Sequence, residues 1–329
     1  MGDELNQTYI VLEGFVGVTK YRYLYFVTMF TAYILILSSN VSIVALIVIH
    51  RNLHEPMYVF IAGLLMNSIL YATVIYPKIL VDVLSEKQVI AYSACLFQWF
   101  AHYSLGAAEI LLLAAMSYDR YVSICNPLRY PVIMRKPNPS VILFSAFLLP
   151  VLLVSVPTAM NVNTRLCHFA LSEIVCGSMI YKLHCIKSVV LNIYGLAVFG
   201  NMIIFCLLFI FFAYTRILTV VHRSGPTVRA KAAQTCFPHL IVLISTSCLS
   251  TFEVILYRTE ANFPITVRLA MTLQKILYHP LFNPIIYGLK MQEINKHFKR
   301  LFSLSKIIHC GNTLTRQTVI VYCLHKPKV

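Results

Sequence analysis

Seven apolar stretches, each long enough to cross a lipid bilayer as a helix, are spread along this chain of 329 residues. A helix needs about 20 apolar residues to cross the hydrocarbon core. The predicted spans are Leu24–Ile49, Met57–Ile79, Ala94–Ile124, Ser140–Met160, Ser188–Tyr214, Ala233–Tyr257 and Val267–Tyr287. These stretches are too short and too numerous to form the core of one soluble domain. The sequence therefore predicts an all-α membrane protein, a bundle of seven transmembrane helices.

The composition agrees with a lipid environment. Hydrophobic residues make up 59% of the chain and charged residues 12%, and the mean hydropathy is +0.75. A soluble domain has about twice that share of charged residues. The net charge of +15 could indicate a nucleic-acid partner, but most Lys and Arg residues fall in short gaps between the apolar stretches. That pattern is typical of membrane proteins, so we expect a lipid bilayer around the chain and no nucleic acid bound to it.

The orientation rests on three signals. Lys and Arg show only a modest excess on one side of the predicted bundle. Asn6 begins a glycosylation sequon, which is used only outside the cytosol. Cys95, Cys167, Cys176 and Cys185 fall together on the same predicted side as Asn6, and disulfides persist in oxidising compartments. We expect a multi-pass plasma membrane protein with residues 1–23 as an extracellular N-terminus and Asn6 glycosylated.

Four sequence motifs carry a family resemblance. They are "PMYVFIAGLL" at 56–65, "LLLAAMSYDRYVSICNPLRY" at 111–130, "KAAQTCFPHL" at 231–240 and "HPLFNPIIYGLK" at 279–290. With these motifs in this order, the chain resembles the rhodopsin-like (class A) G-protein-coupled receptors, and within them the odorant receptors of the fish type. The resemblance covers residues 20–302 and implies a receptor domain over 24–290, with no enzymatic activity. The alternative is a non-olfactory class A receptor for a small ligand.

The resemblance also implies a switch at one end of the bundle. Its expected residues are Asp119, Arg120, Tyr121, Tyr214, Asn283, Pro284 and Tyr287. In the family, the acidic residue holds the Arg in the resting state. Activation then frees that Arg, here Arg120, to contact the α subunit of a stimulatory heterotrimeric G protein. Tyr214 and Tyr287 would move in to support Arg120. The simpler interpretation is that Asp119 and Arg120 only anchor a helix end near the lipid headgroups.

The four cysteines on the predicted outer side permit three disulfide connectivities, and the residues alone do not choose among them. The resemblance to odorant receptors, which extends to "YKLHC" at 181–185, implies the pairs Cys95–Cys176 and Cys167–Cys185. These bonds would hold the long loop 161–187 as a lid over the mouth of the bundle. Closing loops in this way contributes about 2–4 kcal/mol.

Ligand sites in helical bundles are mostly apolar cavities with a few placed polar groups. By position and by resemblance, the candidate ligand-binding residues are His102, Tyr103, Gly106, Ser250, Thr251, Glu253 and Arg258. They predict a small polar, water-borne odorant, and an acidic one if Arg258 binds a carboxylate. Two simpler interpretations stay open: Arg258 could pair with Glu260 at the rim, and His102 could be a packed core residue.

Several positions depart from the pattern or lie beyond it. Ser68 stands where the wider family has an Asp that helps to bind sodium, so we expect no such site, and Glu109 remains as a buried carboxyl. The segment 291–302 has the pattern of an amphipathic helix on the membrane surface. Residues 303–329 form a predicted cytoplasmic tail, in which Cys310 is a candidate for lipidation. No cofactor and no metal site is predicted.

Overall fold

The computed structural model describes residues 9–15, 18–135, 138–186, 188–223, 225, 236–237, 240–251, 264–290 and 294. Its long helices are α1 (Val18–Ile49), α2 (Pro56–Leu84), α3 (Tyr92–Cys125), α5 (Asn138–Val162), α6 (Val189–His222) and α8 (Ile265–Lys290). All of these except α8 meet the length and apolarity expected of a membrane span. A shorter apolar helix, Leu240–Thr251, lies within the sixth predicted span. The chain therefore folds as the predicted helical bundle.

Most helices run beyond their apolar stretches. For example, α1 begins at Val18 instead of Leu24, and α6 continues to His222 beyond Tyr214. Hydropathy marks only the part of a helix that lies in hydrocarbon, whereas the backbone hydrogen bonds continue into the polar headgroup region. The amphipathic segment expected at 291–302 and the tail lie outside the described residues, apart from Ile294, which is helical and fully buried.

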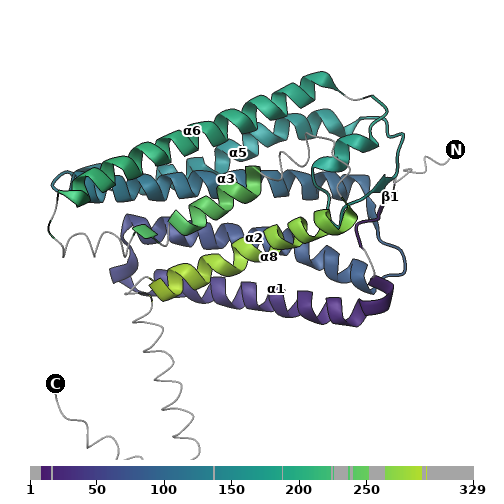
Figure 1. Ribbon diagram of the computed structural model, residues 1–329, viewed down its shortest axis with the longest axis horizontal. Coiled ribbons are helices and arrows are strands. Elements are labelled where there is room, and N and C mark those ends of the chain that lie inside the picture. The colour runs from purple at the N-terminus through teal and green to yellow at the C-terminus, as the bar shows by residue number, and fades with distance from the viewer. Residues whose placement is uncertain are drawn as a thin grey trace, which may run out of the picture.

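The helices form two neighbouring groups (Figure 1). One group contains α1, α2 and α8, which contact each other, and the other contains α3, α5 and α6. Helix α3 joins the groups, because it packs against α2, α5 and α6. The largest core cluster is built from buried residues of both groups, among them Leu64, Leu112, Ile210 and Tyr287. This central position of α3 places its side chains along any cavity between the groups.

A proline in α8 explains one contact between distant helices. Pro284 has no N–H, so the carbonyl of Pro280, four residues earlier, receives no helical hydrogen bond from it. The Asn40 amide of α1 fills that gap: its Nδ2 donates to the Pro280 carbonyl at 2.8 Å and also to Ile36 at 2.8 Å. Asn40 is fully buried. The polar residue in the first span thus ties α1 to α8 at the proline.

A small sheet covers one end of the bundle. Strand β1 (Tyr9–Leu12) pairs antiparallel with β2 (Val89–Ala91), with Ile10 opposite Ile90, and parallel with β3 (Ala170–Leu171), with Leu12 opposite Leu171. Alternate residues of a strand face opposite sides. Ile10 and Leu12 accordingly face the bundle and are buried, whereas Tyr9 and Val11 are exposed. Sequence analysis treated residues 1–23 as an extracellular terminus and did not predict this strand.

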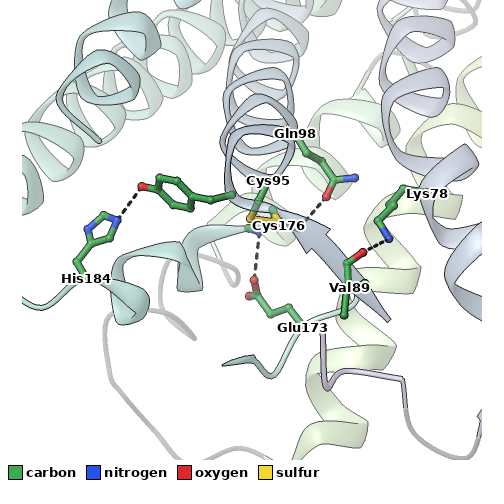
Figure 2. Close-up of a disulfide and its surroundings, with 9 residues drawn as sticks. Lys78, Val89, Cys95, Gln98, Glu173, Cys176 and His184 are labelled. Carbon is green, nitrogen blue, oxygen red and sulfur yellow. Dashed lines mark hydrogen bonds between the residues drawn. A yellow bond between two sulfur atoms is a disulfide. The ribbon is translucent and has the colours of Figure 1, made fainter. Parts of the chain in front are cut away.

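Two disulfides fix the loop between α5 and α6 over the same end. Cys95 at the start of α3 is bonded to Cys176, and Cys167 is bonded to Cys185. These are the two pairs implied by the family resemblance. Figure 2 shows the first bond together with its polar neighbours: the Gln98 side chain accepts a hydrogen bond from the Cys176 backbone N–H at 2.8 Å. The loop is therefore held to α3 both covalently and by hydrogen bonding.

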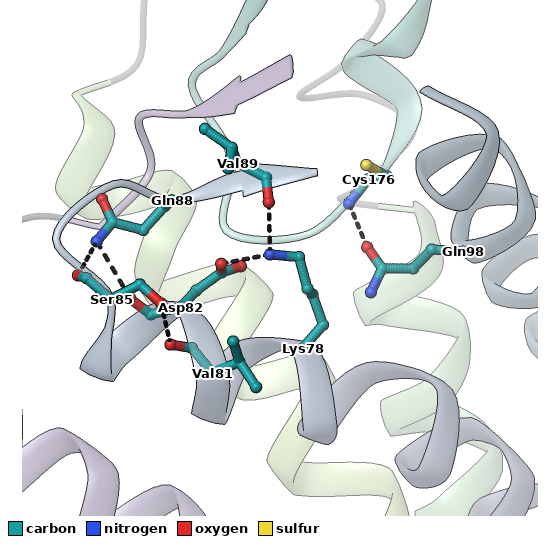
Figure 3. A network of polar contacts seen from close by, with 8 residues as sticks. All are labelled: Lys78, Val81, Asp82, Ser85, Gln88, Val89, Gln98 and Cys176. Atoms are coloured by element: carbon teal, nitrogen blue, oxygen red, sulfur yellow. Dashed lines mark hydrogen bonds and ion pairs between the residues drawn. The ribbon is translucent and has the colours of Figure 1, made fainter. Parts of the chain in front are cut away.

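The C-terminal end of α2 is tied to the sheet through Lys78. Lys78 pairs with the buried Asp82, one turn away, and its ammonium also donates to the Val89 carbonyl of β2 at 2.9 Å (Figure 3). Gln88 donates to the carbonyls of Asp82 and Ser85. A buried carboxylate needs such a partner. The network therefore holds the connection between α2 and α3, including β2, against the helix end.

Candidate functional site

A mostly apolar cavity of about 160 Å³ lies between α3, α5, α6 and α8, with the helix Leu240–Thr251 also contributing to its wall. A single water needs about 10–15 Å³ of such space, so the cavity has room for a small organic molecule. Apolar lining residues include Ile110, Val154, Phe199 and Met202. The Trp99 side chain is buried and also lines it. This is the form expected of a small-molecule site.

The predicted ligand-binding residues divide into three groups. His102, Tyr103, Gly106 and Ser250 line the cavity. Thr251 is described, is exposed and is not part of the cavity wall. Glu253 and Arg258 lie outside the described residues, as does Asn6. Gly106 faces open space, since a Cβ added there would meet no atom within 4 Å. Its small size therefore widens the cavity.

His102 belongs to a chain of three polar side chains from three helices. Its ring Nδ1 lies 3.0 Å from the Tyr71 hydroxyl of α2, and its Nε2 lies 3.0 Å from the Lys275 ammonium of α8. His102 and Tyr71 are buried, and both His102 and Lys275 line the cavity. The interpretation of His102 as a merely packed residue does not account for this arrangement. His102 therefore connects a side chain of α2 with a side chain of α8.

A second polar cluster lies deeper in the bundle. The Asn283 amide of α8 is 3.4 Å from the Glu109 carboxyl of α3 and 3.4 Å from the Ser68 hydroxyl of α2. Asn283 and Ser68 are buried, and Glu109 also lines the cavity. Ser68, at the position where the wider family has an acidic residue, is thus part of this contact between three helices. The described residues contain no group of three or more His, Cys, Asp or Glu side chains that could hold a metal ion.

Asp119 makes a hydrogen bond that the sequence did not predict. The sequence predicted that Asp119 holds Arg120, and the Arg120 charge does act electrostatically on the Asp119 carboxyl, although the direct ion pair in the described part of the chain is Lys78–Asp82. The buried Asp119 carboxyl accepts a hydrogen bond from the Tyr130 hydroxyl at 2.9 Å. Burial and the Asp119 carboxyl raise the pKa of the Tyr130 phenol, so Tyr130 remains a donor.

Arg120 interacts electrostatically with two buried tyrosines as well as with Asp119. Tyr214 of α6 and Tyr287 of α8 are both part of the main core cluster, and each interacts electrostatically with Arg120. Tyr287 is 2% exposed, and its hydroxyl has no hydrogen-bond partner among the described residues. Tyr121 packs against the same cluster, with its ring 5.9 Å from that of Phe212. The predicted switch residues are therefore gathered at one end of the bundle, with Asn283 and Pro284 one turn away along α8.

Comparison with known proteins identifies the family. A sequence model described as olfactory receptor matches residues 29–305. The chain belongs to the olfactory receptor family. The receptor is 34% identical to human (Homo sapiens) olfactory receptor 10K1 over 311 residues, which cover 91% of the receptor and 96% of that relative. It is 31% identical to human olfactory receptor 10K2 over 330 residues, covering 93% and 97%.

A solved structure shows the same fold. The crystal structure of squid rhodopsin superposes with a TM-score of 0.70 at 16% sequence identity, covering 87% of the receptor and 82% of that chain. The receptor therefore has the seven-helix fold of class A G-protein-coupled receptors. It is an odorant-type receptor of the plasma membrane and not an enzyme. The narrower expectation of a fish-type receptor stays a prediction.

Sequence reasoning missed most residues of the cavity wall, among them Lys275 and Tyr194. Lys275 lies within the seventh apolar stretch and was passed over, although a charged residue inside a span usually faces the bundle interior and has a function. Tyr194 also lines the cavity, and its hydroxyl donates to the Leu153 carbonyl of α5 at 3.0 Å. Nothing in the sequence distinguishes Tyr194 from the 19 other tyrosines of the receptor.

Proposed function

We propose that the receptor binds a small polar, water-borne odorant in the cavity and activates a stimulatory heterotrimeric G protein. The observation that supports this most directly is the cavity itself, with an apolar wall and the polar groups of His102, Glu109 and Lys275 within it. An apolar wall with a few placed polar groups suits a small molecule that has one polar end. Family membership favours an odorant over the ligand of a non-olfactory receptor.

The N-terminus faces the outside in this proposal. Strand β1 shares a sheet with strands from the α2–α3 and α5–α6 connections, and the second of these carries both disulfides. The N-terminal strand and the disulfides therefore lie on one side of the bundle. Disulfides persist in the oxidising extracellular environment, which supports a lid, and a cavity mouth, that face the odorant.

The opposite end contains the proposed G-protein switch. Tyr130 holds Asp119, while Arg120 lies near Tyr214 and Tyr287 inside the bundle. In an active packing, Arg120 would contact the G-protein α subunit, and the two tyrosines would rearrange around it. A partner that supplies contacts only to this second packing shifts the equilibrium toward it. Odorant binding would favour the same packing from the other end.

A cell-based cAMP assay tests this function. Cells expressing the receptor are exposed to amino acids, short carboxylic acids, nucleotides and bile-type steroids. We expect at least one agonist to raise cAMP, and Arg120→Ala to abolish the rise. Arg165→Ala is the matched control, because Arg165 is an exposed residue of the disulfide-bonded loop and its loss should leave the response intact.

Two results would contradict the proposal. An Arg120→Ala receptor with a wild-type response would rule out the switch. Nucleotide exchange on an inhibitory but not on a stimulatory G protein would rule out the coupling. Transcripts confined to olfactory sensory neurons would support the odorant role, whereas broad expression would favour a non-olfactory ligand.

A further inference from the structure

The N-terminal strand β1 is the central strand of the sheet at the end of the bundle (Figure 1). Strands β2 and β3 each pair with β1, so β1 joins the α2–α3 connection to the α5–α6 loop within this sheet. Its backbone donors alternate between the two sides. The Leu12 N–H donates to the Gln88 carbonyl at 2.8 Å, whereas the Val11 N–H donates to the Phe169 carbonyl at 2.8 Å. Both connections are therefore held by hydrogen bonds to the same four-residue strand.

The disulfides and β1 hold different parts of the loop between α5 and α6. Cys167 and Cys176 fix the two ends of the segment between them, and β3 (Ala170–Leu171) lies in its middle, where it pairs with β1. Just beyond the pair, the Gly14 N–H donates to the Glu173 carbonyl at 3.3 Å. A Cβ added to Gly14 would lie 2.3 Å from the carbonyl carbon of Glu173. The N-terminal segment thus approaches the loop as closely as only a glycine allows.

The buried face of β1 belongs to the layer that lies between the sheet and the cavity. Ile10 and Leu12 are 0% and 1% exposed, and they share one hydrophobic cluster with Trp99 of α3. Tyr181 of the α5–α6 loop packs against this cluster. Trp99 and Tyr181 also line the cavity, and their rings meet edge to face with centroids 6.0 Å apart. We call these two aromatic side chains the roof residues. One cluster therefore connects β1 with the cavity wall.

From these contacts we infer that β1 positions the roof residues: Ile10 and Leu12 hold Trp99 and Tyr181 in the cavity wall, which makes the N-terminal strand a part of the ligand site. The inference rests on the proposed function where it takes the cavity as the site of the odorant. The disulfides fix only the cysteines that they join, whereas the packing of β1 fixes the aromatic rings between them. This packing is non-covalent, so it can open locally while the bundle stays folded.

Trp99 makes the position of the roof measurable without an odorant or a G protein. It is the only tryptophan of the chain and is 4% exposed, so quenching of the receptor's fluorescence by acrylamide reports access to the roof. The full receptor is measured in lipid nanodiscs, well below its melting temperature. We expect the quenching constant to rise about threefold or more in the double variant Ile10→Ala and Leu12→Ala, because truncation of buried side chains weakens the packing of β1.

Val11→Ala is the matched control. Val11 lies between Ile10 and Leu12 on the opposite face of the strand and is 42% exposed, so its truncation should leave the quenching constant at the wild-type value. Gly14→Ala tests the strand without changing the cluster: its Cβ must displace β1 from Glu173, and quenching should rise again. Melting curves verify folding, and if the double variant does not fold, Gly14→Ala and the two single variants decide.

Hydrogen exchange separates a local effect on the roof from a general loss of stability. Exchange should become faster over residues 168–175 of the loop and stay at the wild-type rate over residues 110–118 in the middle of α3. An unchanged quenching constant in the folded variants, an equal rise in Val11→Ala, or faster exchange in both segments would overturn the inference.

The two proposals fail in different ways. A roof that depends on Ile10 and Leu12, in a receptor that no odorant activates, would contradict the proposed function and leave the role of β1 in place. An odorant that raises cAMP through a receptor whose Trp99 quenching is insensitive to β1 would contradict the inference and leave the function in place.

Discussion

Tyr287 offers the sharpest test of the switch, because its hydroxyl is buried without a hydrogen-bond partner among the described residues. Leaving a buried polar group unpaired costs about 1–3 kcal/mol. Tyr287→Phe removes the oxygen and leaves the ring in place in the core. We therefore expect the unliganded receptor to be stabilised by about 1 kcal/mol, since the small gap left by the oxygen offsets part of the gain. Agonist-driven nucleotide exchange should fall at the same time, because the active packing would use this hydroxyl near Arg120.

Tyr130→Phe is the matched control, because it makes the same chemical change where the hydroxyl is paired. The Tyr130 hydroxyl donates to the buried Asp119 carboxyl at 2.9 Å. Its removal leaves that carboxyl with one partner fewer and should cost about 1–3 kcal/mol. Loss of this contact also releases Asp119, so we expect higher basal activity. The two substitutions should therefore change both stability and activity in opposite directions.

The assay is the apparent melting temperature of purified, unliganded receptor, followed by nucleotide exchange on the stimulatory G protein. One kcal/mol corresponds to about 2–4 °C in domains somewhat smaller than this one. Tyr287→Phe should melt a few degrees above the wild type and Tyr130→Phe a few degrees below it. If Tyr287→Phe instead melts as low as Tyr130→Phe, its hydroxyl is paired in the resting receptor, and the reasoning from an unpaired group is refuted.

Three further outcomes are expected. Gly106→Leu should reduce odorant response without loss of surface expression, because the new side chain would occupy open cavity space; a normal dose–response curve would contradict this. The double substitution Cys95→Ser and Cys176→Ser should lower the stability of the receptor by about 2–4 kcal/mol. Thermal melting measures this loss while the Cys167–Cys185 bond stays intact. Burial lowers the pKa of His184, so the unfolded chain binds the proton more tightly than the folded receptor does. The stability of the folded receptor should therefore fall as the pH drops below about 6.5. Hydrogen exchange in the loop 161–187 should show this fall, and His184→Phe should remove it.

Sequence patterns predicted the bundle because lipid imposes a simple rule on each span. A run of about 20 apolar residues is readable one segment at a time, and the motifs around Arg120 and Asn283 resemble those of a known family. The disulfide pairs followed from that resemblance and not from the residues alone. What a linear pattern could not give was the partner of Asp119 outside its own helix: its carboxyl accepts a hydrogen bond from Tyr130, eleven residues further along the chain.

Long-range pairing explains the features that were missed. Strand β1 has only four residues, and its partners are about 80 and 160 positions away in sequence (Ile10 with Ile90, Leu12 with Leu171). A short strand near the N-terminus therefore gives little local signal. Lys275 was visible as a charge inside an apolar stretch, but its partner His102 lies on another helix. Only the fold shows that these side chains of α3 and α8 lie together at the cavity wall.

The contact between Glu109 and Asn283 connects the two ends of the receptor. Glu109 belongs to the cavity wall, and Asn283 lies one helical turn before Tyr287 on α8. In the proposed function, an odorant in the cavity would contact residues of both α3 and α8 and would favour whichever relative position of these helices fits it best. A shift between α3 and α8 must change the 3.4 Å contact of Asn283 with Glu109 and with Ser68, and with it the placement of Tyr287 relative to Arg120. Since packed interiors resist gradual deformation, the two helices are expected to move between discrete arrangements. The proposed ligand would act on the proposed switch by selecting one of these arrangements.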